Sequence, residues 1–296
     1  MSMGGEFSSK PVLFCCHDAI AAMLDEHQGE LSGQYFLPHT LGGNLSFLQD
    51  KREMEVMAAE CSISIPPKDG FPMIVKPANS VFGSKDDIQI CANNEELDEY
   101  FRSHNRESTL AQHFVDKQSE FQLIGCVTCD GEVIIPGRSE ILRPCKGSNT
   151  SFLRYQEIED GFCDVEKCKR LMEKTGFRGL FSMEFLKDAE GRNNFIEVNF
   201  RNDGNAICVT AAGINLPYIW YLSCIGASYR EEVRKPETLH VIPEFEETAL
   251  LTSGQISFVT FLSDILKSNC GMDFDIRDPK PFFSKLRHRI RNKTAK

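Results

Sequence analysis

The clearest pattern of apolar and polar positions lies between residues 176 and 205. Two apolar-rich runs, at residues 180–186 and 194–200, flank a polar connector that contains Asp188 and Gly191. Strand-forming runs separated by turn-forming residues are typical of a β-hairpin. The sequence therefore predicts a hairpin here, and we centre its turn between residues 190 and 191.

In such a hairpin Glu184 lies directly opposite Glu197, and Asn199 follows on the same face. The other face is apolar and is expected in the core, with Phe181, Met183, Phe185, Ile196 and Val198. Like charges directly opposite each other repel. A divalent cation would resolve the repulsion, because two carboxylates and an amide oxygen suit Mg²⁺. The alternative is a solvated face without metal, since a shift of register would separate the two acids.

The rest of the chain mixes strand and helix patterns, which indicates an α/β or α+β fold. Strands are predicted at residues 11–16, 71–75, 88–91, 109–115, 120–129 and 132–136, with an acidic strand region at 240–247. Helices are predicted at residues 18–30, 51–60, 94–104, 164–175, 207–213, 217–226 and 256–268. Residues 138–152 are expected to form a polar loop, and the basic tail at 285–296 a solvated, partly frayed end.

Composition narrows the class of protein. The chain has 296 residues, enough for one complex domain or two, and its net charge of −10 argues against general affinity for nucleic acid. The sequence shows no transmembrane run and no secretion signal. Twelve scattered cysteines then indicate reduced thiols in a cytoplasmic protein, and the C-x-x-C at Cys126 and Cys129 has no second pair for zinc.

A second candidate for chemistry is Lys76, which ends an apolar strand. A loop of small residues follows it and leads to Lys85. Backbone amides of such a loop can approach phosphate oxygens while lysines neutralise them. The Walker A motif is absent. The segment gains weight from Lys51 upstream and from the acidic hairpin downstream.

The order of these parts, between about residues 48 and 224, resembles the ATP-grasp superfamily, carboxylate–amine ligase type. The matching stretches are Asp50-Lys51, FPMIVKPANSVFGSK, LAQHFV, EFQLIG, MEF and FIEVNFR. The tail FDIRDPKPFF is similar to those of D-aspartate ligase-type members, and carbamoyl-phosphate synthase-like ATP-grasp proteins are similar too. The resemblance implies two α+β subdomains that clasp a nucleotide.

The resemblance also implies roles for individual residues. Lys51, Lys76 and Lys85 would contact the phosphates. Gln112 would accept from the adenine amino group, backbone groups of His113 and Val115 would pair with the edge of the ring, and Glu120 would lie at the ribose. Glu184, Glu197 and Asn199 would hold two Mg²⁺ ions, or Mn²⁺ in their place, and Arg201 would position the substrate. Arg201, or Arg143 as the second candidate, would stabilise an oxyanion.

The implied domains are a partial Rossmann-like segment at residues 1–47, an ATP-grasp domain at 48–230 and a C-terminal extension at 231–296 that packs on it. Within the ATP-grasp domain the lid spans about 78–115 and the body about 116–230. The lid loop has one glycine, Gly83, where many members have several. Members also usually carry a longer N-terminal domain, so the chain is either truncated or completed by a second copy or a partner chain.

The function implied is an ATP-dependent ligase. It would convert a carboxylate into an acyl phosphate and transfer the acyl group to an amine, releasing ADP and phosphate. Its partners would be a small-molecule carboxylate and amine, with no nucleic acid and no membrane. The alternative is a nucleotide-binding protein without ligase activity, favoured by the short N-terminal segment and the glycine-poor lid. A biotin-dependent carboxylase component is disfavoured, because a glycine-rich lid is lacking.

Overall fold

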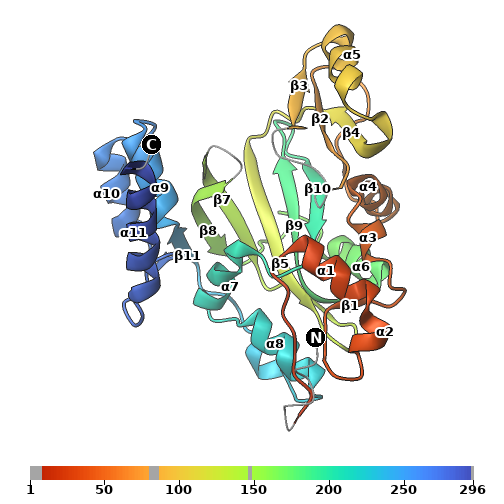
Figure 1. Ribbon diagram of the computed structural model, residues 1–296, viewed down its shortest axis with the longest axis vertical. Coiled ribbons are helices and arrows are strands. Elements are labelled where there is room, and N and C mark those ends of the chain that lie inside the picture. Colours follow the sequence, from red (N-terminus) through yellow and green to blue (C-terminus); the bar gives the residue numbers. More distant parts are fainter. Residues whose placement is uncertain (1–8, 80–86, 146–148, 295–296) are drawn as a thin grey trace.

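The computed structural model describes residues 9–79, 87–145 and 149–294, and this part of the chain forms a large sheet and a small sheet with helices around them (Figure 1). The mixed α+β architecture predicted from the sequence is confirmed. The small sheet and one helix stand at the top of Figure 1, and the large sheet fills the centre.

The large sheet is antiparallel apart from its last pair of strands. Its order is β1 (His39–Thr40), β9 (Phe177–Lys187), β5 (Ser119–Val127), β7 (Arg138–Cys145), β8 (Asn149–Gln156), β11 (Leu239–Ile242) and β12 (Cys270–Gly271). Beside this path, β10 (Asn193–Asn199) pairs with β9, and β6 (Val133–Ile134) pairs with β5. The central pair is β5 and β9, and both strands bury most of their residues.

Alternation along β5 divides the interior between two faces, because neighbouring residues of a strand point opposite ways. Leu123 belongs to a cluster on one face that is covered by α1 (Asp18–Glu26), α3 (Leu45–Leu48), α4 (Lys51–Glu60) and α6 (Val165–Thr175). Ile124 belongs to a second cluster on the other face, under α7 (Ile207–Ala211) and α8 (Leu216–Cys224). Helix α6 ends at Gly176, whose φ of 65° suits glycine, and the chain enters β9 at once.

The small sheet has the order β3 (Gln89–Cys91), β2 (Met73–Pro77), β4 (Thr109–His113), and α5 (Asn94–Ser103) covers one of its faces. Val75, Cys91 and Tyr100 pack together on that side. Because side chains alternate, Lys76 and Gln112 lie on the opposite face. Short 3-10 helices complete the elements at Arg106–Ser108, Gly204–Ala206 and Arg230–Glu232.

The N-terminal region differs from the predicted strand and single helix. The helix predicted at 18–30 is broken at His27 into α1 and α2 (Gln28–Leu31). The strand predicted at 11–16 does not form, and Val12 makes one parallel bridge to Phe36. A strand needs a partner to extend its ladder, and the described chain provides one only at this point. The Rossmann-like character of the segment therefore stays a prediction.

The prediction of a polar loop at 138–152 is wrong, because strands β7 and β8 occupy this region. Their polar side chains pair across the ladder: Glu140 stands opposite Arg154, and Arg154 Nη2 donates to Glu140 Oε2 at 2.6 Å. Arg138 pairs with Glu140 as well as with Glu159. Cross-strand pairs of opposite charge stabilise a sheet, so a polar segment can form a strand.

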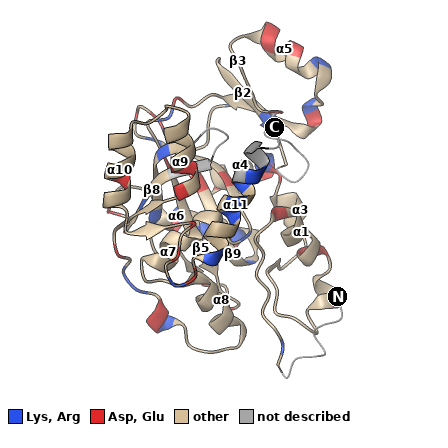
Figure 2. Ribbon diagram, turned by 60° about the vertical axis from the view of Figure 1, so that its left-hand side comes forward, with Lys and Arg blue, Asp and Glu red and all other residues tan. Residues whose placement is uncertain are grey.

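Two predictions for the C-terminal region also need correction. The acidic region at 240–247 is a strand only to Ile242, and Glu244 opens helix α9 (Glu244–Thr252). The tail belongs to a helix, α11 (Lys280–Thr294), which packs against α9 through stacked rings of Phe282 and Phe245. In Figure 2 the acidic residues of α9 and the basic residues of α11 lie side by side, and Arg289 pairs with Glu246 at 3.3 Å. Helix α10 (Phe258–Lys267) is present as predicted.

One arginine ties this helical region to the large sheet. Arg143 on β7 makes ion pairs with Glu247 of α9 and, at 2.6 Å, with Asp264 of α10. Both carboxylates are buried, where a charge is costly without a partner, and the guanidinium supplies positive charge to both. The ion pairs fix α9 and α10 against the sheet.

Within the described residues, no single helix has the length and apolar character needed to cross a membrane. The pair Gly204–Ala211 and Leu216–Cys224, bent by 90°, meets the length and composition requirements together. Ile219 and Trp220 of this pair are buried in the core beneath the sheet.

We predict that Arg143→Met destabilises the protein by about 3 kcal/mol, because two buried carboxylates each lose an ion pair with the guanidinium. The free energy of unfolding in urea measures this. Arg102→Met removes an exposed pair with Glu99 and is the control, with an expected change below about 0.5 kcal/mol. Equal effects of the two substitutions would contradict the anchoring role of Arg143.

Candidate functional site

The hairpin of β9 and β10 places Glu184 directly opposite Glu197, as predicted. The route to this register differs from the prediction. Near the turn Phe195 pairs with Phe185, so the turn centres on residue 190, and a bulge between Phe195 and Glu197 then shifts the register by one residue. A bulge inserts one extra residue and re-aims the side chains that follow it. Here the extra residue is Ile196, and the bulge brings Glu197 opposite Glu184.

The bulge also corrects one predicted core residue. Phe195 is fully buried and packs against Phe185 with ring centroids 5.8 Å apart, whereas Ile196 is half-buried. The other four predicted core residues are buried, namely Phe181, Met183, Phe185 and Val198.

Glu184 lies in a ring of amide donors. Gln122 Nε2 donates to Glu184 Oε1 at 3.2 Å, and Asn199 Nδ2 donates to the same oxygen at 3.0 Å. Burial, together with the nearby charges of Glu197, Asp203 and Glu120, raises the pKa of Glu184 to about 8. This shift favours the protonated form of Glu184 in the metal-free protein.

Glu197 has the opposite electrostatic environment. Lys51 Nζ lies 3.0 Å from Glu197 Oε2. Burial alone would raise the pKa of Glu197, but Lys51, Lys76 and Arg201 bring it below its ordinary value. The pKa values of the two facing carboxyl groups are therefore shifted in opposite directions, which lessens their repulsion in the absence of metal.

Lys51 and Lys76 reach this site from different elements. Lys51 is the first residue of α4, and Lys76 lies near the end of β2. The backbone N–H of Lys51 donates to Ala78 O at 2.8 Å, and Asp50 forms a bridge with Asn79. The start of α4 is thus joined to the segment that leaves β2. Burial lowers the pKa of Lys76, and the nearby charge of Glu197 partly offsets this effect.

The residues predicted to contact adenine lie at the end of β4 and just after it, where the chain leaves the small sheet. Gln112 is buried, and the described residues offer its Oε1 no hydrogen-bond donor. An unpaired buried acceptor suits a ligand amino group. The N–H of His113 donates to Pro67 O at 2.7 Å, so this N–H is not open to an adenine ring. Val115 is buried.

Glu120, on β5, forms an ion pair with Lys117. It lies on the same face of the strand as Gln122 and is therefore directed to the side on which Glu184 lies. Lys85 lies outside the described residues. Arg143 makes its ion pairs with the C-terminal helices.

Arg201 is held by two acids that sequence reasoning missed. Its Nε donates to Asp18 Oδ2 at 3.1 Å, and its Nη1 donates to Asp203 Oδ2 at 3.0 Å. Asp203 also accepts from Ser182 Oγ at 3.0 Å. Asp203 follows the hairpin by only a few residues, and this proximity was an available signal. Asp18 is far away in the sequence, and no local pattern indicates it.

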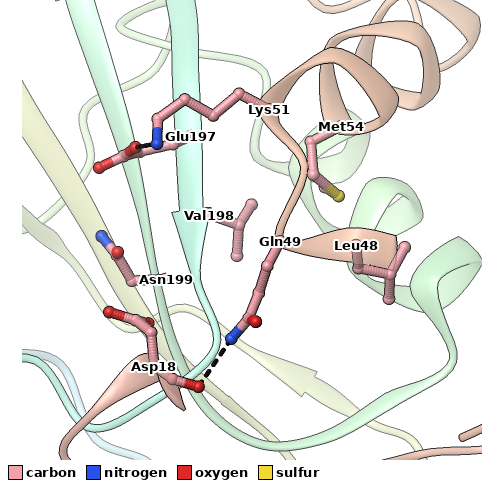
Figure 3. Close-up of a pocket in the computed structure, with 8 residues that line it drawn as sticks. All are labelled: Asp18, Leu48, Gln49, Lys51, Met54, Glu197, Val198 and Asn199. Carbon is pink, nitrogen blue, oxygen red and sulfur yellow. Dashed lines mark hydrogen bonds and ion pairs between the residues drawn. The ribbon is translucent and has the colours of Figure 1, made fainter. Parts of the chain in front are cut away.

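A pocket opens beside the hairpin (Figure 3). Its lining residues are Asp18, Leu48, Gln49, Lys51, Met54, Glu197, Val198 and Asn199. Figure 3 shows the ammonium of Lys51 on the carboxylate of Glu197, and Gln49 Nε2 donating to the backbone oxygen of Asp18, a bond of 2.9 Å. Polar groups of α1, α4 and β10 therefore converge on one opening.

The donor set of the hairpin fits Mg²⁺. Among the described residues no group of three or more His, Cys, Asp or Glu side chains is arranged to hold a metal ion. Mg²⁺ needs no such cage, because it is usually bound by one or two carboxylates together with substrate phosphates and water. Two carboxylates with a nearby amide match this requirement.

Residues 117–246 match the family model described as "ATP-grasp in the biosynthetic pathway with Ter operon". No curated protein matches the sequence. Among solved structures, the biotin carboxylase domain of the Hydrogenobacter thermophilus 2-oxoglutarate carboxylase has a TM-score of 0.62 at 16% identity, over 80% of this chain and 59% of that chain.

Two ligase-type structures are similar to the same extent. The L-amino acid ligase of Bacillus licheniformis has a TM-score of 0.62 at 17% identity, over 80% of this chain and 62% of that one. The Staphylococcus aureus N5-carboxyaminoimidazole synthetase, complexed with ADP, has a TM-score of 0.64 at 16% identity, over 82% and 68%. This chain covers 59% of the Hydrogenobacter thermophilus structure and 62% of the Bacillus licheniformis structure, which is less than two thirds of each.

These similarities show the fold: the chain shares the fold of these three structures, and its residues 117–246 match an ATP-grasp family model, in agreement with the predicted ATP-grasp fold. Its family-model match covers much of the large sheet together with α6, α7 and α8. The hairpin that carries Glu184 and Glu197 lies inside that match.

The raised pKa of Glu184 predicts a pH dependence of stability in the metal-free protein. Its folded-state pKa of about 8 lies above the ordinary value of a glutamate, so the folded chain holds a proton that the unfolded chain releases. The stabilisation is complete below the unfolded pKa, near 4.3, and is lost as the pH rises through about 8. Glu184→Gln cannot titrate and should lack this loss.

Thermal melting of wild type and Glu184→Gln from about pH 5 to pH 9, with a chelator present, measures the effect. We expect the Tm of wild type to fall relative to that of the variant as the pH rises. Glu166→Gln, an exposed change on α6, should follow wild type. Parallel curves for wild type and Glu184→Gln would show that Glu184 is ionised throughout.

Proposed function

We propose that the protein is a Mg²⁺- and ATP-dependent ligase that activates a carboxylate as an acyl phosphate and joins it to an amine. The observation that carries this proposal is the convergence of Lys51 and Lys76 on the facing pair Glu184 and Glu197. Anion-binding cations and metal-binding carboxylates are the two requirements of phosphoryl transfer.

Glu184, Glu197 and Asn199 would hold the metal, and we propose two Mg²⁺ ions. In the metal-free protein Lys51 provides the positive charge beside Glu197, and a proton neutralises Glu184. Metal binding would then displace the proton from Glu184. Because Glu197 would then bind the metal, its ion pair with Lys51 would weaken, and Lys51 could contact the nucleotide phosphates.

Lys76 and Lys51 would neutralise the phosphates, and the buried Oε1 of Gln112 would accept the adenine amino group. Glu120 would face the ribose. Lys85, His113 and Val115 keep their proposed roles at the lid and at the ring edge, with the backbone carbonyl of His113 as the contacting group. The lid at about 78–115, the body at about 116–230 and the flanking segments at 1–47 and 231–296 likewise stay proposals.

When bound, Mg·ATP supplies the phosphoryl group that converts the carboxylate into an acyl phosphate, which the amine then attacks. Arg201 is our candidate for orienting the carboxylate and stabilising the oxyanion. Its guanidinium is fixed between Asp18 and Asp203, and a group fixed before reaction stabilises developing charge without reorganisation. Arg143 is the second candidate.

The free thiols of all cysteines whose side chains the structure describes are consistent with the cytoplasmic location that we propose. A small-molecule carboxylate and an amine would be the partners, without nucleic acid or membrane. ADP release from ATP, with and without pooled amino acids, tests the ligase proposal. Release that depends on amino acids supports it, and tight nucleotide binding without release would favour a nucleotide-binding protein.

We predict that Lys76→Ala weakens binding of Mg·ATP by on the order of 1.5–3 kcal/mol, because a buried charge-assisted contact with phosphate is lost. Isothermal titration calorimetry gives the affinity. Lys174→Ala removes an exposed lysine on α6 that pairs with Glu60 and should leave the affinity unchanged. Equal affinities of Lys76→Ala and wild type would show that the phosphates bind elsewhere.

We predict that Glu197→Gln abolishes most of the stabilisation by Mg·ATP, since stabilisation follows ligand affinity for the native state. The same change should destabilise the free protein by about 1 kcal/mol or more, because the ion pair with the buried Lys51 is lost. Thermal melts with and without Mg·ATP give both values. Identical ligand-induced shifts in wild type and variant would exclude Glu197 from the metal site.

A further inference from the structure

Helix α10 has its polar and apolar sides reversed relative to a normal surface helix. Its one acidic residue, Asp264, is buried and pairs with Arg143. Apart from Lys267 at the last position, its exposed side consists of Phe258, Val259, Leu262, Ile265 and Leu266. Val259 is 76% exposed and Leu266 77% exposed. Surface helices of globular proteins normally turn such residues inward, so this face indicates a contact.

The positions of these five residues are symmetric about Leu262. Phe258 and Leu266 lie four residues before and after it, and Val259 and Ile265 lie three residues before and after it. When a helix packs antiparallel against a copy of itself, each residue meets the one placed symmetrically about the central residue. Phe258 would then meet Leu266 of the other copy, and Leu262 would meet its own counterpart. A two-fold interface requires this kind of self-complementary patch.

Charge and location are also consistent with self-association. The exposed face of α10 carries no acid, although the whole chain has a net charge of −10. Two copies could therefore approach there without local repulsion. Helix α10 lies at the outer edge of the C-terminal helices, away from the small sheet and from the N-terminal helices (Figure 1). No described element covers this side of it.

The area sets the strength of the contact. The patch is one face of a helix of 10 residues, so its area is smaller than the about 800 Å² per partner of a standard stable interface. With the polar rim around the helix, the area is that of a weak dimer. Every-fourth-residue ridges, such as Phe258, Leu262 and Leu266, pack into one another in the commonest class of helix pair.

We propose that the protein forms a two-fold symmetric dimer in which α10 packs antiparallel against α10 of a second copy, with the axis at Leu262. The interface is separate from the acidic hairpin and is independent of the proposed ligase activity. It differs from completion of the N-terminal region by another chain, because it uses the C-terminal helices.

Sedimentation equilibrium of the full chain at concentrations up to about 200 µM tests the proposal. Wild type should approach twice the chain mass of 33.5 kDa. Leu262→Glu places two like charges on the axis and should raise the dissociation constant at least about tenfold. Leu41→Glu changes a residue that is 70% exposed elsewhere, and it should dimerise as wild type does. Circular dichroism melts check that both variants are folded.

The register is tested by a charge pair. Phe258→Lys and Leu266→Glu should each weaken self-association. An equimolar mixture of the two variants should form the mixed dimer, because the introduced lysine of one copy meets the introduced glutamate of the other. A wild type that stays monomeric over the whole range would overturn the proposal, as would a dimer that survives Leu262→Glu. Failure of the mixed pair to associate would overturn the antiparallel register.

Discussion

The opposition of Glu184 and Glu197 across one pair of strands is the constraint on which the candidate site depends. Two largely buried carboxyl groups that face each other across a strand pair cannot both remain charged unless nearby groups compensate the charge. The fold provides that compensation unequally, with amide donors at Glu184 and lysines at Glu197. The positions of Gln122, Asn199, Lys51 and Lys76 follow from this requirement. Each comes from a different element, so the packing of α4 and the small sheet is linked to the electrostatics of the hairpin.

The sequence predicted the mixed α and β class and the facing acids because both depend on local patterns, whereas the ATP-grasp fold came from the resemblance of several motifs. Alternation marks the hairpin, and the two acids stand at positions that a short connector brings together. The bulge at Ile196 was not predictable. A hairpin with its turn between residues 190 and 191, and a hairpin with its turn at residue 190 and one extra residue, both fit the same pattern of apolar positions. Phe195 replaced Ile196 in the core for that reason.

Other features depend on contacts between distant segments, which a single sequence does not reveal. The segment that forms β7 and β8 looked too polar for strands, but Glu140 is neutralised by Arg138 on its own strand and by Arg154 across the ladder. Asp18 was missed because it reaches Arg201 from another element, and the partners of Arg143 belong to helices about a hundred residues further along. In each case a polar residue is explained by a partner that only the fold identifies.

The bond between the N–H of Lys51 and the carbonyl of Ala78 has a mechanical consequence. It fastens the exit of the small sheet to the first turn of α4, which in turn lies along β10. A rotation of the small sheet cannot separate its strand β2 from α4 at this point without breaking that bond. The backbone positions that carry Lys51 and Lys76 are therefore held near each other at the junction between α4 and the small sheet. Any movement of the small sheet that preserves this bond would keep the start of α4 beside the end of β2.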